Sequence, residues 1–446
     1  MTTPPPGCPA HTEAEAGPGT TSAPAPAPGP APGPEAEESV PLSGPRFQSE
    51  PSALYRELRR EHGPVVPVTL AGGIPAWLVI GYREMHQVTT DASLFTRDST
   101  LWNQWDSLPP NWPLAPMISR EQPSILYTVG ERHQARAGMI SDALEGVDPH
   151  ELRRYAEEFA DSLIDLFCTT GETDIISRYA MLLPVRVIAK MYGVPDDQGP
   201  DLVAALIDMI DGRERALAGQ QHVQQTIMAL IAEKSQFPGP DVASRMLANT
   251  QGFSAVDAAQ DLMVMAAAGH QPTADWIGNT LRLMLTDDRF TASLSGGRHS
   301  VAEAMNEVLW EDTPTQNVAG RWAARDTRLG GRAIAAGDLL ILGLAAANAD
   351  PQVRTDASVL TGGNNAFFSF GHGEHRCPFP AQEIAEVIAR TAVEVLLDRL
   401  PDIDLAVPAE ELTRRPSAWL RGMTALPVTF TPTPALRPAP APGGHR

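Results

Sequence analysis

The chain has only three cysteines in 446 residues, Cys8, Cys168 and Cys377, too few and too scattered for a disulfide framework. We therefore expect it to work in a reducing compartment, the cytoplasm. Its only lysines are Lys190 and Lys234, and the formal net charge is −20, so nucleic acid is not an expected partner. The sequence has no apolar run long enough to span a membrane, and its N-terminus has neither the basic start nor the apolar segment of a signal peptide.

Proline, glycine and alanine are abundant, and arginine largely replaces lysine, a composition typical of GC-rich actinobacterial genes. Residues 1–44 and 433–446 consist mostly of these small residues and proline. Such segments cannot bury a core, so we expect both to be disordered tails, either simply solvated or available for docking a partner. Residues 45–432 have ordinary hydrophobic content and are expected to form one large domain.

The patterns within this domain are mostly helical. β-type runs at residues 65–70 and 76–80 enclose a glycine-containing turn, which predicts a hairpin. The sequence therefore predicts a mainly α fold with small β-sheets and no βαβ alternation. Apolar residues recur with helical spacing in residues 55–58, 82–90, 152–176, 182–192, 201–213, 220–234 and 254–287.

The most informative stretch is FFSFGHGEHRCPFPAQEIA, residues 367–385. Cys377 ends a glycine-containing loop and precedes a helical pattern, and the positive end of a helix dipole favours a thiolate. Glycines let the backbone approach a flat group closely. Cys377 is therefore either a thiolate ligand of a haem iron or a buried free cysteine behind a glycine turn.

This loop resembles the haem-binding loop of the cytochrome P450 superfamily, F-x-x-G-x-x-x-C-x-G, with Phe370, Gly373 and Cys377 at the matching positions. Phe379 replaces the final glycine of that pattern. The resemblance extends over about residues 45–432. It implies a haem b (iron protoporphyrin IX), held without covalent attachment between a long distal helix and the loop, with Cys377 as the axial ligand and Phe370 beside it.

The long helical pattern contains Ala268 and Gly269, which resemble the start of the family's distal-helix motif A-G-x-(D/E)-T. Ala268 is thus expected against the haem. Gln271 and Pro272 stand where the family has its proton-delivering acid and alcohol, and neither side chain can supply protons in that way. We expect Gly269, Gln271, Pro272 and Thr273 to shape the oxygen side, with Thr273 or a water held by Gln271 as the relay. The alternative is that dioxygen is not activated in the standard way.

The resemblance also implies cationic groups that neutralise the haem propionates. Arg136 matches the arginine of the family's H-x-x-x-R helix, and Arg132 occupies the histidine position. A plain surface charge pair is the alternative for Arg136. Arg321, in Val318-Ala-Gly-Arg-Trp-Ala, and His375 match the remaining propionate partners.

One family motif, E-x-x-R, is altered. Glu307 matches its glutamate, but Trp310 stands in place of the arginine, and residues 355–375 contain no arginine to serve as the usual second partner. We expect both residues to have a structural role, with Glu307 held by backbone donors, by Trp310 or by groups near His375, or else exposed. The replacement of this arginine by tryptophan resembles the pattern of an actinobacterial branch of the superfamily. Members of that branch are often encoded in conservon operons together with a small GTPase.

The irregular segment 101–124 matches a pocket-lining loop of the family. Trp102 and Trp105 could stack on a substrate or pack the loop onto the core. Met265, Val318 and Leu420 are the other residues expected to line the substrate pocket.

These features predict a haem-thiolate oxidoreductase of the monooxygenase type, acting on a small organic substrate such as a secondary metabolite. Its electrons would come from a ferredoxin and its reductase, with Arg376 helping to form a docking spot. Two alternatives are a haem-binding sensor or regulatory partner of a small GTPase, and an enzyme that couples or rearranges substrates without inserting oxygen.

Overall fold

The computed structural model describes residues 39–42, 49–109, 124–195, 216–249, 252–291, 299–354 and 364–436, together with a few isolated positions between these ranges. The described residues belong to one compact unit, Gly33–Arg446. No helix among them combines the length and apolarity needed to cross a membrane.

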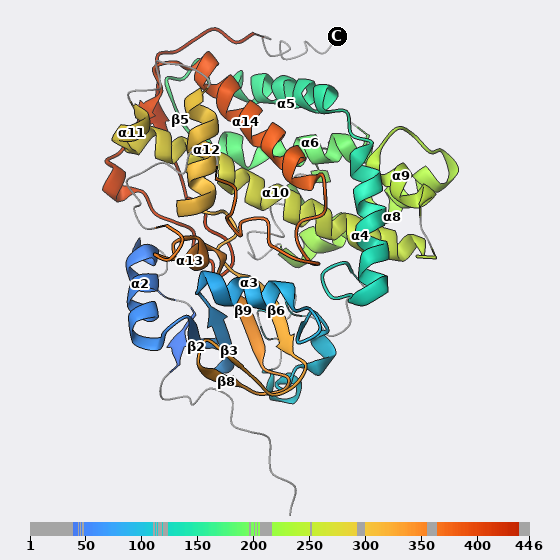
Figure 1. The fold of residues 1–446 in the computed structure, drawn as a ribbon. Helices are drawn as coiled ribbons and strands as arrows, with labels where there is room; N and C mark the ends of the chain where they lie inside the picture. The colour runs from blue at the N-terminus through green and yellow to red at the C-terminus, as the bar shows by residue number, and fades with distance from the viewer. Residues whose placement is uncertain are drawn as a thin grey trace, which may run out of the picture. The chain divides into compact units, whose positions relative to one another are not determined.

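Helices make up most of the unit, as the apolar periodicity predicts (Figure 1). Helix α10 packs against α6, α8, α12 and α14, and α14 also packs against α5. The helices of at least five residues are α2 (Pro51–His62), α3 (Tyr82–Thr90), α4 (Gly130–Glu145), α5 (Pro149–Ile164), α6 (Leu182–Tyr192), α8 (Ala216–Gln236), α9 (Val242–Ala248), α10 (Ala255–Thr286), α12 (His299–Glu311), α13 (Leu344–Asn348) and α14 (Ala381–Arg399), with a π-helical turn at Ile176–Ala180.

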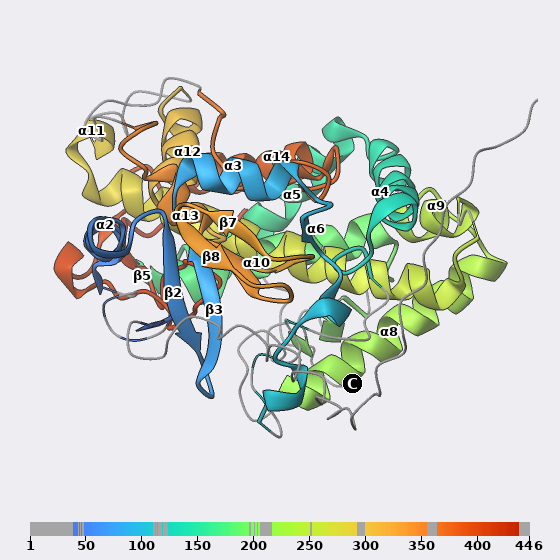
Figure 2. The same ribbon diagram turned by 60° about the horizontal axis from the view of Figure 1, so that its bottom comes forward.

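The main sheet has six strands in the order β1-β2-β3-β9-β6-β4 (Figures 1 and 2). The predicted hairpin is confirmed, because β2 and β3 are antiparallel and Leu70 pairs with Ile74 across a two-glycine turn. The strands are β1 (Val40–Pro41), β2 (Val65–Leu70), β3 (Ile74–Val79), β4 (Phe95–Thr96), β6 (Val318–Ala323) and β9 (Leu339–Leu342), with β7 (Thr327–Leu329) and β8 (Arg332–Ile334) forming a two-stranded sheet, and β10 (Asp404–Leu405), β11 (Pro427–Thr429) and β5 (Glu172–Asp174) a three-stranded one.

Helix α10 begins with a capping box, in which the Ser254 side chain accepts a hydrogen bond from the Asp257 backbone and the Asp257 carboxylate accepts one in return. Such reciprocal bonds satisfy the free N–H groups of the first turn. The helix continues without interruption past Pro272 to Thr286. Pro272 therefore does not break the helix.

One predicted helix boundary is wrong. The helix expected over residues 152–176 ends at Ile164 and is followed by β5, because the intervening Gly171 takes a φ of +81° at a turn. A few residues of both segments expected to be tails form hydrogen bonds with the rest of the unit. Val40 pairs with Val68 in the main sheet, and the Thr433 N–H donates to the Cys168 carbonyl at 2.8 Å. Residues 1–38, 437–446 and most of the helix expected at 201–213 lie outside the described residues.

Candidate haem site

The cysteine loop is shaped by its backbone. Gly371 and Gly373 have φ values of +72° and +74°, and the Cys377 N–H donates to the Phe370 carbonyl at 2.8 Å. Burial, with a contribution from Glu383, raises the pKa of the Cys377 thiol to about 11. The direction of this shift is opposite to the one expected from the helix dipole. Such a thiol becomes a thiolate when a metal cation replaces its proton.

Helix α10 presents a partly exposed face in its otherwise buried middle. Met265 and Pro272 are half-buried and Ala268 is exposed, at spacings of three and four residues that place them on one side. One turn further, Trp276 meets the ring of Phe370, from the cysteine loop, edge-on at 5.9 Å. The face is lined by short side chains and leads to the cysteine loop, an arrangement that suits a flat cofactor.

The four residues expected on the oxygen side do not share one face. Pro272 belongs to the partly exposed face, and Gly269 borders it, where a Cβ would lie 3.2 Å from Ile188. Gln271 and Thr273 are buried.

The Gln271 side chain is engaged by protein groups. Its amide Nε2 donates to the Asp275 carboxylate at 3.0 Å and to the Met181 sulfur at 3.3 Å, while its Oε1 has no partner in the described residues. Asp275, in turn, accepts from Arg415 at 2.7 Å, yet burial raises the pKa of its carboxyl to about 6. A buried carboxyl thus lies one helical turn after the position where the sequence lacks one.

A buried cationic cluster lies next to the cysteine loop. Arg321, on β6, is 2% exposed, and its Nε and Nη1 have no hydrogen-bond partner in the described residues. Arg97 follows the neighbouring strand β4 and donates from Nη1 to the Ala319 carbonyl at 3.0 Å, while its Nε is also unpartnered. The ion pairs of the described residues include neither arginine. Burial, and then the charge of Arg97, keep the pKa of Arg321 well below its ordinary value.

Two histidines complete this cluster. The rings of His133 and His375 lie 3.9 Å apart, and His133 contacts the carbonyls of Ile125 and Glu374, each at 3.2 Å. Burial and the neighbouring arginines lower the pKa of His375. The ligand atoms of His133, Glu374 and His375 lie within 4.8 Å of one another. However, the two buried arginines beside them favour an anion over a metal cation.

Buried guanidinium N–H groups without a protein acceptor suit an anionic group with several oxygens. The carboxylates of haem propionates meet this requirement. The residues present therefore fit a haem between the partly exposed face of α10 and the Cys377 loop.

The other two predicted propionate partners make different contacts. Arg136 is fully buried and forms ion pairs with Asp261, at 2.7 Å, and Asp257, both on α10. Arg132 has a 60% exposed side chain and comes no closer than 3.8 Å to Asp257. The charge-pair alternative for Arg136 is thus the one observed, although the pair is buried and not on the surface.

Sequence reasoning missed Arg97 and His133. The family motif aligns Arg132 with its histidine, but on α4 the Arg132 side chain is exposed and the neighbouring His133 is buried. Nothing in the local sequence distinguishes Arg97 from a surface arginine, since only the pairing of β4 with β6 brings it beside Arg321.

The expectations for Glu307 are wrong. Its carboxylate is buried and forms ion pairs with Arg354 and, at 3.5 Å, with Arg289. Arg354 directly precedes the arginine-free segment on which the prediction was based. Trp310 is also buried, and its indole N–H donates to the Asn364 carbonyl at 2.8 Å.

The expected substrate residues lie in two settings. Trp102 is 3% exposed in an apolar cluster, where its ring lies 4.9 Å from Trp105 and 5.7 Å from Trp112. These contacts correspond to the packing alternative. Met265, Val318 and Leu420 are each half-buried, and Leu420 forms an isolated β-bridge with Thr315.

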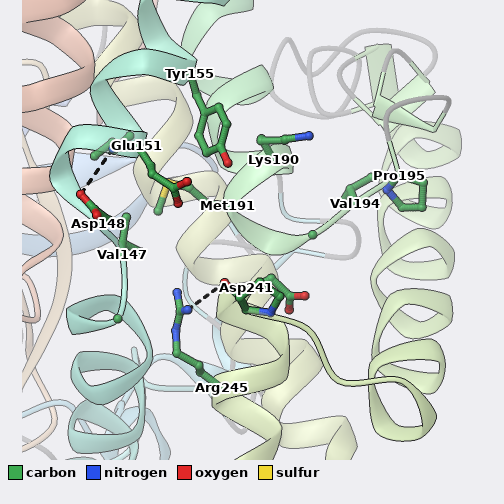
Figure 3. A pocket seen from close by; sticks show the side chains of 14 residues that line it. Val147, Asp148, Glu151, Tyr155, Lys190, Met191, Val194, Pro195, Asp241 and Arg245 are labelled. Carbon is green, nitrogen blue, oxygen red and sulfur yellow. Dashed lines mark hydrogen bonds between the residues drawn. The ribbon is translucent and has the colours of Figure 1, made fainter.

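A separate cavity of about 390 Å³ lies where α5 begins, α6 ends and α9 begins (Figure 3). Tyr155, Lys190 and Arg245 are among its lining residues, and none of the residues expected to bind haem or substrate is. It is therefore distinct from the candidate haem site.

Comparisons with known proteins cover most of the chain. No family model matches the chain. The vitamin D(3) 25-hydroxylase of Pseudonocardia autotrophica is 29% identical over 399 residues, covering 87% of this chain and 96% of the relative. The cytochrome P450 monooxygenase PikC of Streptomyces venezuelae is 28% identical over 403 residues, covering 87% and 92%.

Solved structures extend the likeness to three dimensions. CYP154C4 from a Streptomyces species matches with a TM-score of 0.79 at 25% identity, covering 88% of this chain and 98% of that one. CYP154A1 from Streptomyces coelicolor gives 0.75 at 27% identity, covering 88% and 100%.

The mainly helical fold and these relatives point to one class of protein, the haem-dependent oxidoreductases. The chain is similar over most of its length to cytochrome P450s, and these homologues support an oxidoreductase of the monooxygenase type with a haem cofactor.

Proposed function

We propose that this chain is a monooxygenase in which Cys377 is the axial ligand of a haem b held without covalent attachment. The observation that carries the proposal is the buried Arg321 with two unpartnered N–H groups, beside His375 and two residues of chain before Cys377. A buried charge without an acceptor is costly, so this arrangement is understandable if an anionic cofactor belongs there. The haem, when bound, supplies the iron chemistry that activates oxygen.

The protein residues hold and orient this cofactor. Arg321 and Arg97 would donate to the propionate carboxylates, and His375, whose ring lies against that of His133, would donate as well. Met265, Ala268 and the neighbouring backbone provide an apolar face that excludes water. Arg136 is assigned a different role: it anchors α10 through Asp257 and Asp261.

Proton delivery on the oxygen side must differ from the usual acid–alcohol pair. Pro272 has no hydroxyl or N–H, and Gln271 uses its amide N–H groups on Asp275 and Met181. We assign Thr273 and the Gln271–Asp275 pair as the remaining candidates for holding protons near this side. Asp275 is the only one of these that carries a titratable group.

For the substrate, we propose a small, mostly apolar organic molecule of the secondary-metabolite type. The relatives named as a vitamin D(3) hydroxylase and as PikC support this class. Met265, Val318 and Leu420 are the proposed contacts. We propose a ferredoxin and its reductase as the electron source, with the exposed Arg376 at the docking spot.

The altered distal helix supports one alternative, an enzyme that couples or rearranges its substrate without oxygen insertion. Turnover of a broad substrate panel with a surrogate ferredoxin system, and in parallel with peroxide, separates the two. Oxygenated products support the monooxygenase, and only coupled or rearranged products support the alternative. No product at all, together with tight binding of a small GTPase, would favour a regulatory role.

The first test is the absorbance spectrum of the reduced, carbon monoxide-bound protein. A strongly red-shifted Soret band, lost in Cys377→Ala and kept in Cys168→Ala, is the expected result, because Cys168 is a buried free cysteine elsewhere in the core. The same band in Cys377→Ala would rule out this cysteine as the ligand.

A further inference from the structure

The segment before the cysteine loop is held by α12. Helix α12 carries both Glu307 and Trp310, and several of its groups bond to residues 364–370. The Trp310 indole N–H donates to the Asn364 carbonyl at 2.8 Å, and the Asn306 amide donates to Asn365 at 3.0 Å. The Phe367 ring meets the Trp310 ring edge-on at 5.8 Å. Trp310 thus ties this segment to the helix by both a hydrogen bond and ring packing.

The connection continues to the cysteine through a few buried bonds. The Ser369 hydroxyl donates to the Leu309 carbonyl of α12 at 2.7 Å. The next residue, Phe370, accepts the Cys377 N–H at 2.8 Å. Displacing α12 would therefore displace the carbonyl that fixes the backbone of Cys377.

The charge on α12 is balanced from another element. Glu307 is 1% exposed at its side chain, and Arg354, which follows α13, is 8% exposed and pairs with it. Arg354 also donates to Glu311 at 2.7 Å, so one guanidinium bridges two acids a helical turn apart. Arg289 reaches both acids from farther away, at 3.5 and 3.4 Å. Glu307 thus has a buried cationic partner that does not come from α12 itself.

We propose that Arg354 and Trp310 together replace the arginine that is missing from this chain's E-x-x-R motif. Arg354 neutralises Glu307, and Trp310 anchors the segment before the loop. Both are positioning residues that act on Cys377 through α12. The inference rests on the proposed role of Cys377 as haem ligand.

The experiment compares Arg354→Met, Arg354→Lys and Trp310→Phe in the full-length, haem-loaded protein. Haem content per chain is measured together with the share of the reduced, carbon monoxide-bound spectrum that has the thiolate-type band. Arg399→Met is the matched control, because Arg399 also bridges two acids, Asp161 and Asp165 at 2.7 Å each, but contacts α5 and not the loop. Circular dichroism checks that each variant retains its helices.

Arg354→Met is expected to reduce the ratio of thiolate-type to thiol-type absorbance roughly tenfold or more, as a buried glutamate loses its main partner. Arg354→Lys, which keeps the charge, should recover most of the ratio. Trp310→Phe keeps the ring but removes the N–H, and should shift the ratio in the same direction by a smaller factor. Arg399→Met should leave the ratio of the haem-loaded fraction unchanged.

The proposal is overturned if folded Arg354→Met keeps the wild-type ratio, or if Arg399→Met changes it equally. Should Arg354→Met fail to fold, Arg354→Lys and Trp310→Phe decide: a wild-type ratio in Trp310→Phe contradicts the anchoring role, and a ratio in Arg354→Lys as low as in a Glu307→Gln variant contradicts the charge role. If the wild-type protein itself lacks the thiolate band, the proposed function fails first.

Discussion

Arg321 and Arg136 are both buried arginines near the candidate haem site, and the structure predicts opposite consequences for their removal. Arg321 has no ion pair among the described residues, whereas Arg136 has two. We consider Arg321→Met and Arg136→Met, which remove the charge and keep an unbranched apolar side chain.

In the haem-free protein, Arg321→Met removes a buried charge that forms no ion pair with a described carboxylate and is compensated only in part by the charge of Glu374. We expect the free energy of unfolding to stay equal or to increase, because the cost of burying that charge disappears. Arg136→Met leaves Asp261 buried without its partner, and the pKa of Asp261 is already raised to about 6 by burial. Breaking a buried pair in this way costs about 3–5 kcal/mol.

The effects on haem affinity should be the reverse, with Arg321→Met weakening haem binding more than Arg136→Met does. A hydrogen bond involving a charged group contributes about 1.5–3 kcal/mol. Losing the contacts of Arg321 to the propionates should therefore weaken haem binding by roughly 10- to 100-fold. Arg136→Met should weaken it little among molecules that remain folded.

The assay is haem titration of the haem-free protein, followed by tryptophan fluorescence quenching, alongside urea unfolding of the same preparations. The reasoning is refuted if Arg321→Met binds haem as tightly as the wild type, or if it destabilises the haem-free chain as much as Arg136→Met does.

Three further outcomes are expected. Trp102→Ala should lower the free energy of unfolding by about 3–5 kcal/mol in urea titrations, because its ring is packed in the core. Unchanged stability together with altered substrate binding would instead support a role of Trp102 in substrate binding. Burial alone would raise the pKa of Asp312, but three arginines, Arg414 first, hold it at about 2, below the ordinary 3.8. Its contribution to stability is therefore full above pH 4 and is lost as the pH falls towards 2. Asp312→Asn should lower stability at pH 7 and flatten the acid decline in urea titrations between pH 7 and 2, and an unchanged decline would contradict this. Pro272→Thr should raise the rate of product formation per electron supplied by a surrogate ferredoxin, within the roughly 10²–10⁴-fold range of positioned proton donors; an unchanged rate would show that the relay does not need this hydroxyl.

Features that depend on local sequence were predictable. The spacing of apolar residues gave α3 and α10 to within a residue or two, and the two-glycine turn gave the hairpin of β2 and β3. Cys377 could be singled out as a candidate ligand because its loop is a continuous segment of the sequence. The glycines of this loop are needed for its backbone conformation. Local backbone preferences act within a few residues, so they can be read along the chain.

Tertiary contacts decided which charges meet. Arg97 and Arg321 come together through strand pairing, Arg354 reaches Glu307 across 47 residues, and Arg136 finds acids on a helix more than a hundred residues away. The family motif alone could not show whether Arg132 or His133 faces the interior. The two are neighbours on α4, and the orientation of the helix decides which of the two side chains is buried. The sequence by itself indicated the resemblance to a family, several of the helices and the cysteine loop. Only the tertiary structure determined the partners of the buried charges, because desolvation and ion pairing depend on distances in space.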